Sequence, residues 1–127
     1  MSKFKPYKLT NQDKKIIKIF SDLGMPHNLA KTLMYISQVD ECRSAEIEHG
    51  ANLRQPEVSV SIQELHRRGW IKKRDLKKKG KGRPVHIYKL SNPINDIIVN
   101  FEQQKTKEIN LIKNDLKELK NLVDERQ

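Results

Sequence analysis

The apolar residues of this chain change their spacing at Gly69, and that change limits the folds that the sequence can adopt. Before Gly69 they recur every three or four residues, as Leu29, Leu33 and Ile36 do, which is the spacing of one helix face. After Gly69 the period becomes two, in Trp70-Ile71 and again in residues 85–90, and this is the period of a strand. A chain of 127 residues is long enough for one domain with a modest core. The sequence therefore predicts a mostly α fold with a small β-hairpin, of the α+β class.

Two helices are expected near the N-terminus, after an arm formed by residues 1–10. The first covers about residues 11–23 and begins with Thr10 as its N-cap and Asp13 in its first turn. Gly24 is its expected stop. The second covers about residues 26–38, with Pro26 in its first turn.

The next two helices are short and close together. Ser44 is expected to cap a helix over residues 45–49, which Gly50 ends. A turn with Leu53 as its apolar plug leads to a fourth helix over about residues 55–68. Two short helices joined by a tight turn are the outline of a helix-turn-helix.

The positive charge of the chain is concentrated in residues 67–89. This segment holds eleven basic residues and one acid, so it carries the whole net charge of +10. Its centre is a basic loop with glycines, residues 77–84, between the two predicted strands. A helix-turn-helix followed by such a hairpin is a winged helix, and a concentrated charge of this size attracts a polyanion. The alternative is a solvated lysine-rich loop.

One helix is expected from about residue 93 to residue 127. Its apolar residues form two groups, separated by the polar run 102–108, and the second group steps by 3, 4, 3 and 4 as in a coiled-coil seam. An isolated helix with such a seam exposes an apolar stripe, so we expect it to pair with a second copy of the chain; the alternative is that it folds back on its own domain. The predicted domains are thus the arm 1–10, a winged helix-turn-helix over 11–92 and a dimerisation helix over 93–127. The predicted dimerisation residues are Ile94, Ile97, Ile98, Phe101, Ile109, Ile112, Leu116, Leu119 and Val123.

The fourth helix has one apolar and one polar face. Val58, Ile62 and Leu65 share the face expected in the core. A recognition helix places its N-terminal residues near base edges in the major groove. The predicted DNA-binding residues of this helix are Arg54, Gln55, Pro56, Ser59, Val60, Gln63 and Arg67. The basic wing is expected to cover residues 72–89, and its predicted DNA-binding residues are Lys77, Lys78, Lys79, Lys81 and Arg83.

Some of these residues have chemistry that suggests a role. Gln63 can offer its amide to adenine, Val60 can contact a thymine methyl, and Arg54 can reach guanine or a phosphate. Ser59 suits a phosphate. For each of them the alternative is an ordinary exposed residue. Carboxylates repel phosphate, so Glu57 and Glu64 are expected to face either a cytosine edge or the protein.

Several motifs together resemble a known family. Leu53-Arg54-Gln55-Pro56-Glu57-Val58-Ser59, followed by Glu64-Leu65 and Arg68-Gly69-Trp70-Ile71, is similar to the recognition helix and first wing strand of archaeal winged-helix regulators of the MarR/TrmB type. Residues 81–90 resemble the wing and second strand of the same proteins, and the likeness covers about residues 10–92. The resemblance implies dimeric, sequence-specific binding of duplex DNA and regulation of transcription. With 127 residues, the chain is expected to be a short form of this type, without the C-terminal sugar-binding domain of longer TrmB proteins.

Other classes of function fit the sequence less well. No phosphate-binding glycine loop, catalytic triad or metal-ligand spacing is present, so we expect neither an enzyme nor a cofactor. A single cysteine and an N-terminus without an apolar signal region indicate a cytoplasmic protein, and no apolar run is long enough for a membrane span. Cys42 is either a structural thiol or a thiol sensor. His66 and His86 are either surface residues, phosphate contacts or a source of pH-dependent binding.

Two alternatives to a promoter-bound homodimeric regulator remain open. A winged helix can serve as a protein-interaction module of the transcription machinery, with only weak non-specific DNA binding. It can also bind RNA or chromatin without sequence discrimination, although the scarcity of aromatic residues disfavours stacking on single strands. The sequence does not identify an operator, the direction of regulation or a small-molecule effector.

Overall fold

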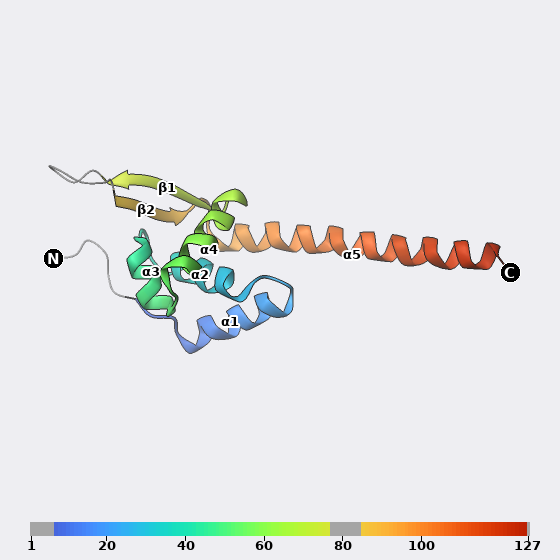
Figure 1. Cartoon of the computed structure of the whole chain (residues 1–127), viewed down its shortest axis with the longest axis horizontal. Helices are drawn as coiled ribbons and strands as arrows, with labels where there is room; N and C mark the ends of the chain where they lie inside the picture. The colour runs from blue at the N-terminus through green and yellow to red at the C-terminus, as the bar shows by residue number, and fades with distance from the viewer. Residues whose placement is uncertain (1–6, 77–84, 127) are drawn as a thin grey trace. The chain divides into compact units, whose positions relative to one another are not determined.

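A computed structural model describes residues 7–76 and 85–126 of the chain. The described residues form five helices and a two-stranded antiparallel hairpin, which confirms the predicted mostly α winged helix-turn-helix with a long C-terminal helix (Figure 1). The elements are α1 (Asn11–Asp22), α2 (His27–Ser37), α3 (Ser44–Ala51), α4 (Gln55–Arg67), β1 (Ile71–Leu76), β2 (Val85–Leu90) and α5 (Ile94–Glu125). The chain divides after Pro93 into two compact units, the winged helix and α5.

The start of α1 follows its predicted capping pattern. The Thr10 hydroxyl accepts a hydrogen bond from the Asp13 backbone N–H at 3.1 Å, and the Asp13 carboxylate accepts one from the Thr10 N–H at 2.9 Å. Asp13 is buried, and it also accepts a hydrogen bond from the hydroxyl of Tyr7. Reciprocal capping of this kind satisfies two backbone donors that would otherwise lack partners.

The N-termini of both helices of the helix-turn-helix are capped by glutamate carboxylates, whereas the sequence pattern suggested a serine cap for α3. The prediction that Ser44 caps α3 is wrong: Ser44 is the first residue of the helix, and the N-cap is Arg43, whose N–H donates to Glu46 Oε1 at 2.6 Å. The start of α4 has the same device, since the N–H of Arg54 donates to Glu57 Oε1 at 2.8 Å. A glutamate at the third helical position therefore orders the beginning of both helices.

The prediction that Gly50 ends α3 is also wrong. The helix continues to Ala51, and Asn52 then takes a left-handed conformation with φ of 54°. Gly50 is buried inside the helix, and a Cβ at this position would lie 2.2 Å from Tyr35 Cε2 and 2.2 Å from the backbone oxygen of Tyr7. Glycine is needed here because two other segments pack against the backbone of α3.

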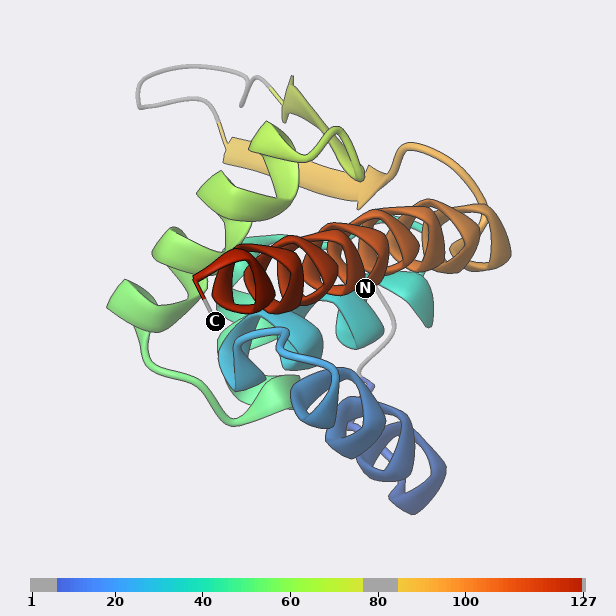
Figure 2. The ribbon, with the colours of Figure 1, turned by 90° about the vertical axis from the view of Figure 1, so that its right-hand side faces the viewer.

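The core of the winged helix collects side chains from every one of its elements. Leu53 is buried, as predicted for the plug of the turn, and α2 is buried along most of its length. The fully buried side chains are Tyr35, Ile17, Leu33, Ile36, Ile47, Leu65, Ile87, Val58, Thr32 and Cys42. The core fixes α4 against α2 and α3 on one side and against β1 at its C-terminal end (Figure 2).

The hairpin is longer than the sequence suggested. The first strand begins at Ile71 and continues to Leu76, with Ile71 opposite Leu90 and Leu76 opposite Val85. Cys42 forms an additional antiparallel bridge with Tyr88: its N–H donates to the Tyr88 carbonyl at 3.0 Å, and the Tyr88 N–H donates to the Cys42 carbonyl at 2.8 Å. The hairpin is thus fastened through β2 to the segment that precedes α3.

Helix α5 is continuous across the polar run 102–108. It begins at Ile94, directly after Pro93, and ends at Glu125. Ile97 and Phe101 are buried, whereas the apolar side chains from Ile109 onward are exposed. Within the described residues, no helix combines the length and the apolar character of a membrane-spanning segment.

Candidate nucleic-acid interface

Helix α4 presents an exposed ridge opposite its buried face. Val58, Ile62 and Leu65 are buried, as the helical wheel predicts, and Ser61 joins them. On the other side Val60 is 67% exposed, although it is apolar. Pro56, Gln63 and Arg67 are exposed as well. An apolar side chain in water at the centre of a polar ridge is available for contact with a partner.

A hollow of about 400 Å³ lies between this ridge and the hairpin. It brings together residues of α3, α4 and both strands: Ser44, Gln55, Ser59, Ile62, Gln63, His66, Lys73, His86 and Tyr88. Three of the predicted recognition residues, Gln55, Ser59 and Gln63, therefore share one concave surface with a lysine and two histidines. Among the described residues no carboxylate lines this hollow, although the Asp75 carboxylate lies 2.7 Å from Nδ1 of His86.

A second hollow, of about 600 Å³, lies on the other side of the ridge, toward α2. Its lining is mostly apolar and its charged groups are both acidic: Pro26, Asn28, Leu29, Pro56, Glu57, Val60, Ser61 and Glu64. The hairpin side of the ridge thus carries the exposed Lys73, whereas the α2 side carries two carboxylates. Electrostatics favour an external anion on the hairpin side of α4, beside Lys73.

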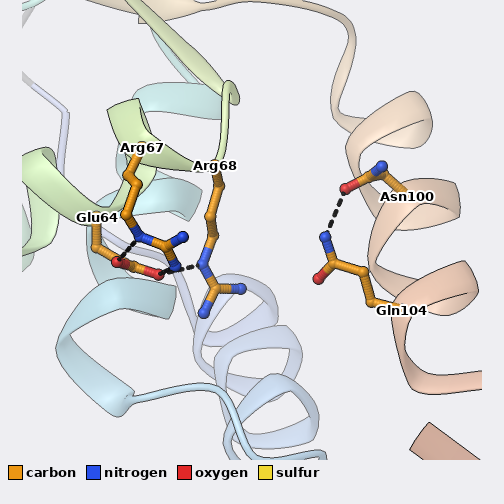
Figure 3. A network of polar contacts seen from close by, with 5 residues as sticks. All are labelled: Glu64, Arg67, Arg68, Asn100 and Gln104. Atoms are coloured by element: carbon orange, nitrogen blue, oxygen red, sulfur yellow. Dashed lines mark hydrogen bonds and ion pairs between the residues drawn. The ribbon is translucent and has the colours of Figure 1, made fainter. Parts of the chain in front are cut away.

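The two glutamates of α4 face the protein, which is one of the two orientations that the sequence allowed. Glu57 accepts the Arg54 N–H and also a hydrogen bond of 3.2 Å from the amide of Asn28, and the backbone hydrogen bond is the main reason that its pKa is lowered. Glu64 accepts hydrogen bonds from Arg67 Nε at 2.8 Å and Arg68 Nε at 2.7 Å (Figure 3). These two guanidinium groups lower the pKa of Glu64 to about 2.

The predicted recognition residue Arg67 is consequently held at the side of the helix. Its guanidinium makes a second contact with Glu64, 2.5 Å from Oε2, and this pairing raises its pKa. Arg68 lies with its guanidinium carbon 5.0 Å from the ring centre of Trp70. The two arginines near the C-terminus of α4 therefore neutralise Glu64, and Gln63 and Val60 are exposed on the central part of the ridge.

The described part of the hairpin contains both paired and unpaired cations. Arg74 makes hydrogen bonds of 2.7 and 2.8 Å with the carboxylate of Glu41. His86 lies opposite Asp75 with 2.7 Å between Nδ1 and Oδ1. Three lysines are exposed and make no ion pair with any residue of 7–76 or 85–126: Lys72, Lys73 and Lys89. They are available to an external anion.

The predicted basic wing covers residues 72–89, but the individual contact residues were predicted only at its tip. The five predicted wing residues, Lys77, Lys78, Lys79, Lys81 and Arg83, lie outside the described residues. Lys73 lies within the predicted basic wing but was not among its predicted contact residues, although it lines the hollow beside Gln63. The signal that could have found it is the period of two: a strand extended past Ile71 places residue 73 on the same face as residue 71.

The thiol of Cys42 is a structural group. Its side chain is 1% exposed, and burial, reinforced by Glu46 and Glu41, raises its pKa to about 12. A thiol of this kind carries almost no thiolate at neutral pH and is therefore unreactive. Among the described residues, no group of three or more histidine, cysteine, aspartate or glutamate side chains is arranged to hold a metal ion.

Comparison with known proteins supports the fold. No protein-family model and no curated protein sequence matches the chain. A possible transcriptional regulator from Methanosarcina mazei Go1 has a similar structure, with a TM-score of 0.63 and 18% identity over 83% of this chain and 87% of its own. A MarR-family transcription regulator gives a TM-score of 0.53 and 17% identity over 80% of this chain and 66% of its own.

A further similar structure is that of TrmBL2, described as an archaeal chromatin protein with a novel mode of DNA binding. It has a TM-score of 0.55 and 14% identity over 87% of this chain, which spans 42% of the length of TrmBL2. At these identities the likeness establishes the fold, and the chain has the winged-helix architecture of MarR-like proteins.

Proposed function

We propose that this chain is a sequence-specific duplex-DNA-binding regulator of transcription that acts as a homodimer on a palindromic or pseudopalindromic promoter site. The observation that carries the proposal is the exposed ridge of α4, on which Gln63 lines the hairpin-side hollow together with Lys73, while the exposed Val60 borders the hollow on the α2 side. The similar structures described as transcription regulators support it.

In this proposal α4 enters the major groove and its ridge reads the bases. The amide of Gln63 pairs with an adenine edge, and the Val60 side chain contacts a thymine methyl. Arg54, exposed at the start of α4, reaches a guanine or a phosphate. Gln55 and Ser59 contact the backbone or base edges from the wall of the hairpin-side hollow.

The hairpin supplies sequence-independent affinity. Lys73 and His86 line the hollow next to the ridge, and the phosphate strand beside the major groove is placed there. The basic tip, with Lys77, Lys78, Lys79, Lys81 and Arg83, follows the backbone or enters the adjacent minor groove. Arg67 contributes mainly by neutralising Glu64, so that no unpaired carboxylate stands at this end of α4.

The proposed dimer forms through α5. Pairing of α5 with a second copy buries its exposed apolar side chains. Two copies related by a twofold axis match two half-sites about 34 Å apart along the DNA. The proposed principal contact is the exposed seam from Ile109 to Val123. Of the other expected dimerisation residues, Ile98 is exposed, whereas Ile97 and Phe101 are buried in the single chain and are not proposed as contacts with a second copy.

Selection from random duplex DNA, followed by footprinting of the selected site, tests the proposal. We expect a twofold-symmetric site that is bound at least about 10³-fold more tightly than random DNA at physiological salt. A matched variant, Gln63→Ala, should relax selection at one base pair of each half-site while Lys107→Gln, on α5, leaves selection unchanged.

Two results would contradict the proposal. Binding to all duplexes with equal affinity would instead indicate an architectural role without sequence discrimination. Failure of every duplex to outcompete bulk DNA, together with a monomeric chain, would indicate a protein-interaction module.

A further inference from the structure

The exposed seam of α5 can be assigned to heptad positions. Ile109, Leu116 and Val123 are spaced by seven residues and occupy position a, whereas Ile112 and Leu119 occupy position d. All five side chains are between 49% and 58% exposed. Leu122 falls at position g, next to the seam, and Leu111 lies off it. The described chain therefore offers two heptads of unfilled a and d positions.

The residues that flank the seam carry opposite charges on its two sides. Both e positions within the seam are basic, Lys113 and Lys120. The preceding g positions are acidic, Glu108 and Asp115. All four lie on the exposed surface of the helix. In coiled coils these flanking positions decide which partner and which orientation is chosen.

Parallel pairing turns this pattern into attraction. In a parallel, in-register dimer a g residue faces the e residue five positions later on the partner helix. Glu108 then faces Lys113 of the second copy, and Asp115 faces Lys120 of the second copy. The twofold axis repeats both contacts, so every charged g–e pair of the seam joins opposite charges.

Antiparallel pairing turns the same pattern into repulsion. In that orientation e faces e and g faces g on the partner helix. Each charged e–e contact would then oppose lysines, Lys113 or Lys120, and the charged g–g contact would oppose acids. Like charges in such positions are destabilising.

The seam is also bounded at its N-terminal end. One heptad earlier, positions a and d are taken by Glu102 and Lys105. Lys105 is occupied on its own helix, 3.1 Å from Glu108 and 5.3 Å from the ring centre of Phe101. Charged residues at these positions do not extend an apolar seam, so the pairing begins at Ile109 and its register is fixed.

We infer that α5 pairs with α5 of a second copy of this chain as a parallel, in-register two-stranded coiled coil over residues 108–123, selected by the Glu108–Lys113 and Asp115–Lys120 contacts between copies. The inference rests on the proposed homodimer and adds its orientation. Since α5 follows the winged helix directly in the chain, parallel pairing joins both winged helices at the same end of the coil.

A charge-swapped chain distinguishes the two orientations. The variant carries Glu108→Lys, Asp115→Lys, Lys113→Glu and Lys120→Glu, so its own parallel dimer keeps every g–e attraction. A parallel heterodimer with the original chain opposes like charges, whereas an antiparallel heterodimer opposes unlike charges at e–e and g–g. After the two chains are mixed, with one isotope-labelled, native mass spectrometry should show heterodimer depleted about tenfold from its statistical proportion.

Cysteine cross-linking gives an independent readout. Val123→Cys should form an interchain disulfide readily, because two a residues of a parallel dimer face each other at a separation that suits a disulfide. The control Asn121→Cys, at the outward position f, should not. Cys42 is buried and does not interfere.

The outcomes separate this inference from the proposed function. Enrichment of the heterodimer, or cross-linking only when Val123→Cys is mixed with Ile112→Cys, would show antiparallel pairing and overturn the inference. A monomer at micromolar concentration in sedimentation would overturn it as well. DNA selection with the unmodified chain is read separately: a parallel dimer that prefers no sequence refutes the proposed function alone, and an antiparallel dimer with a selected site refutes the orientation alone.

Discussion

Replacement of Lys73 by glutamine tests the base of the hairpin, where the structure places a lysine beside the ridge of α4. Lys73 is exposed on β1, lies opposite Tyr88 and lines the hollow beside Gln63. Glutamine removes the charge and keeps most of the length of the side chain. Because Lys73 makes no ion pair within the described residues, the change removes no internal salt bridge.

The expected effect follows from counterion release. Each phosphate that is neutralised contributes about 0.9 to the slope of log K against log salt, so a dimer that loses two contacts should have a slope smaller in magnitude by about 1.8. At 0.15 M salt the same relation gives a loss of about fivefold for each protomer and about 30-fold for the dimer. The plots of log K against log salt for the original chain and for Lys73→Gln should converge near 1 M salt, where counterion release no longer drives binding.

Fluorescence anisotropy with a labelled duplex, titrated at several salt concentrations, measures both quantities. Lys107→Gln is the matched control, since it removes the same charge from an exposed position of α5 outside the a and d seam. We expect it to leave the slope within error of the original. An unchanged slope for Lys73→Gln, or equal changes for both variants, would refute the placement of a phosphate strand in the hairpin-side hollow.

Three further predictions concern the fold, the thiol and the ridge. Gly50→Ala should lower the free energy of unfolding by about 1–3 kcal/mol, because its Cβ would meet Tyr35 and the Tyr7 backbone at 2.2 Å; urea titration with an unchanged midpoint would contradict the packing. Cys42 should resist thiol reagents at pH 8 until the chain unfolds. The pKa of this thiol is raised to about 12, against about 8.5 in the unfolded chain. Above about pH 8.5 the thiol therefore ionises only in the unfolded chain, and the free energy of unfolding should fall by about 1.4 kcal/mol per pH unit. Cys42→Ala should remove that slope between about pH 9 and 10. Gln63→Ala should lose about 1–3 kcal/mol of discrimination at one base pair with an unchanged salt slope; a change in slope without a change in discrimination would assign Gln63 to a phosphate.

The sequence predicted those features of the fold that depend on local patterns. Thr10 and Asp13 form the reciprocal cap that their spacing indicates, and α4 buries the face that its apolar period indicates. The change of period at Gly69 correctly separates the helices from the hairpin, and Gly69 itself takes the positive φ of 77° that favours glycine after a helix. Patterns of this kind are read within a few residues, so no tertiary information is needed.

The errors arise where distant segments decide the local structure. Glycine is the residue type that commonly ends a helix, but Gly50 lies inside α3. It is needed there because the ring of Tyr35, 15 positions earlier in the chain, packs against its backbone. The strand character of residues 72–76 comes from pairing with β2, since their own side chains are nearly all polar. Cys42 and Tyr88 form a β-bridge although they lie far apart in the chain, and no local sequence pattern predicts such a bridge. The candidate site was predicted to the same extent: the ridge of α4 was predicted, whereas the hollow that the hairpin adds was not.

The arrangement of lysines on the hairpin favours a partner with two anionic strands over the alternative of a merely solvated loop. Lys72 and Lys89 are directly opposite each other and share one face of the hairpin, whereas Lys73 lies on the other face. Like charges placed opposite in a strand pair cost stability, and the same hairpin shows the stabilising solution at Asp75 and His86. The repulsion between Lys72 and Lys89 is not relieved by any described residue, and unrelieved repulsion of this kind is typical of a binding surface. A DNA groove has a phosphate strand on each side, so a hairpin with lysines on both faces can contact both strands. A partner with a single flat anionic surface would contact the lysines of only one face.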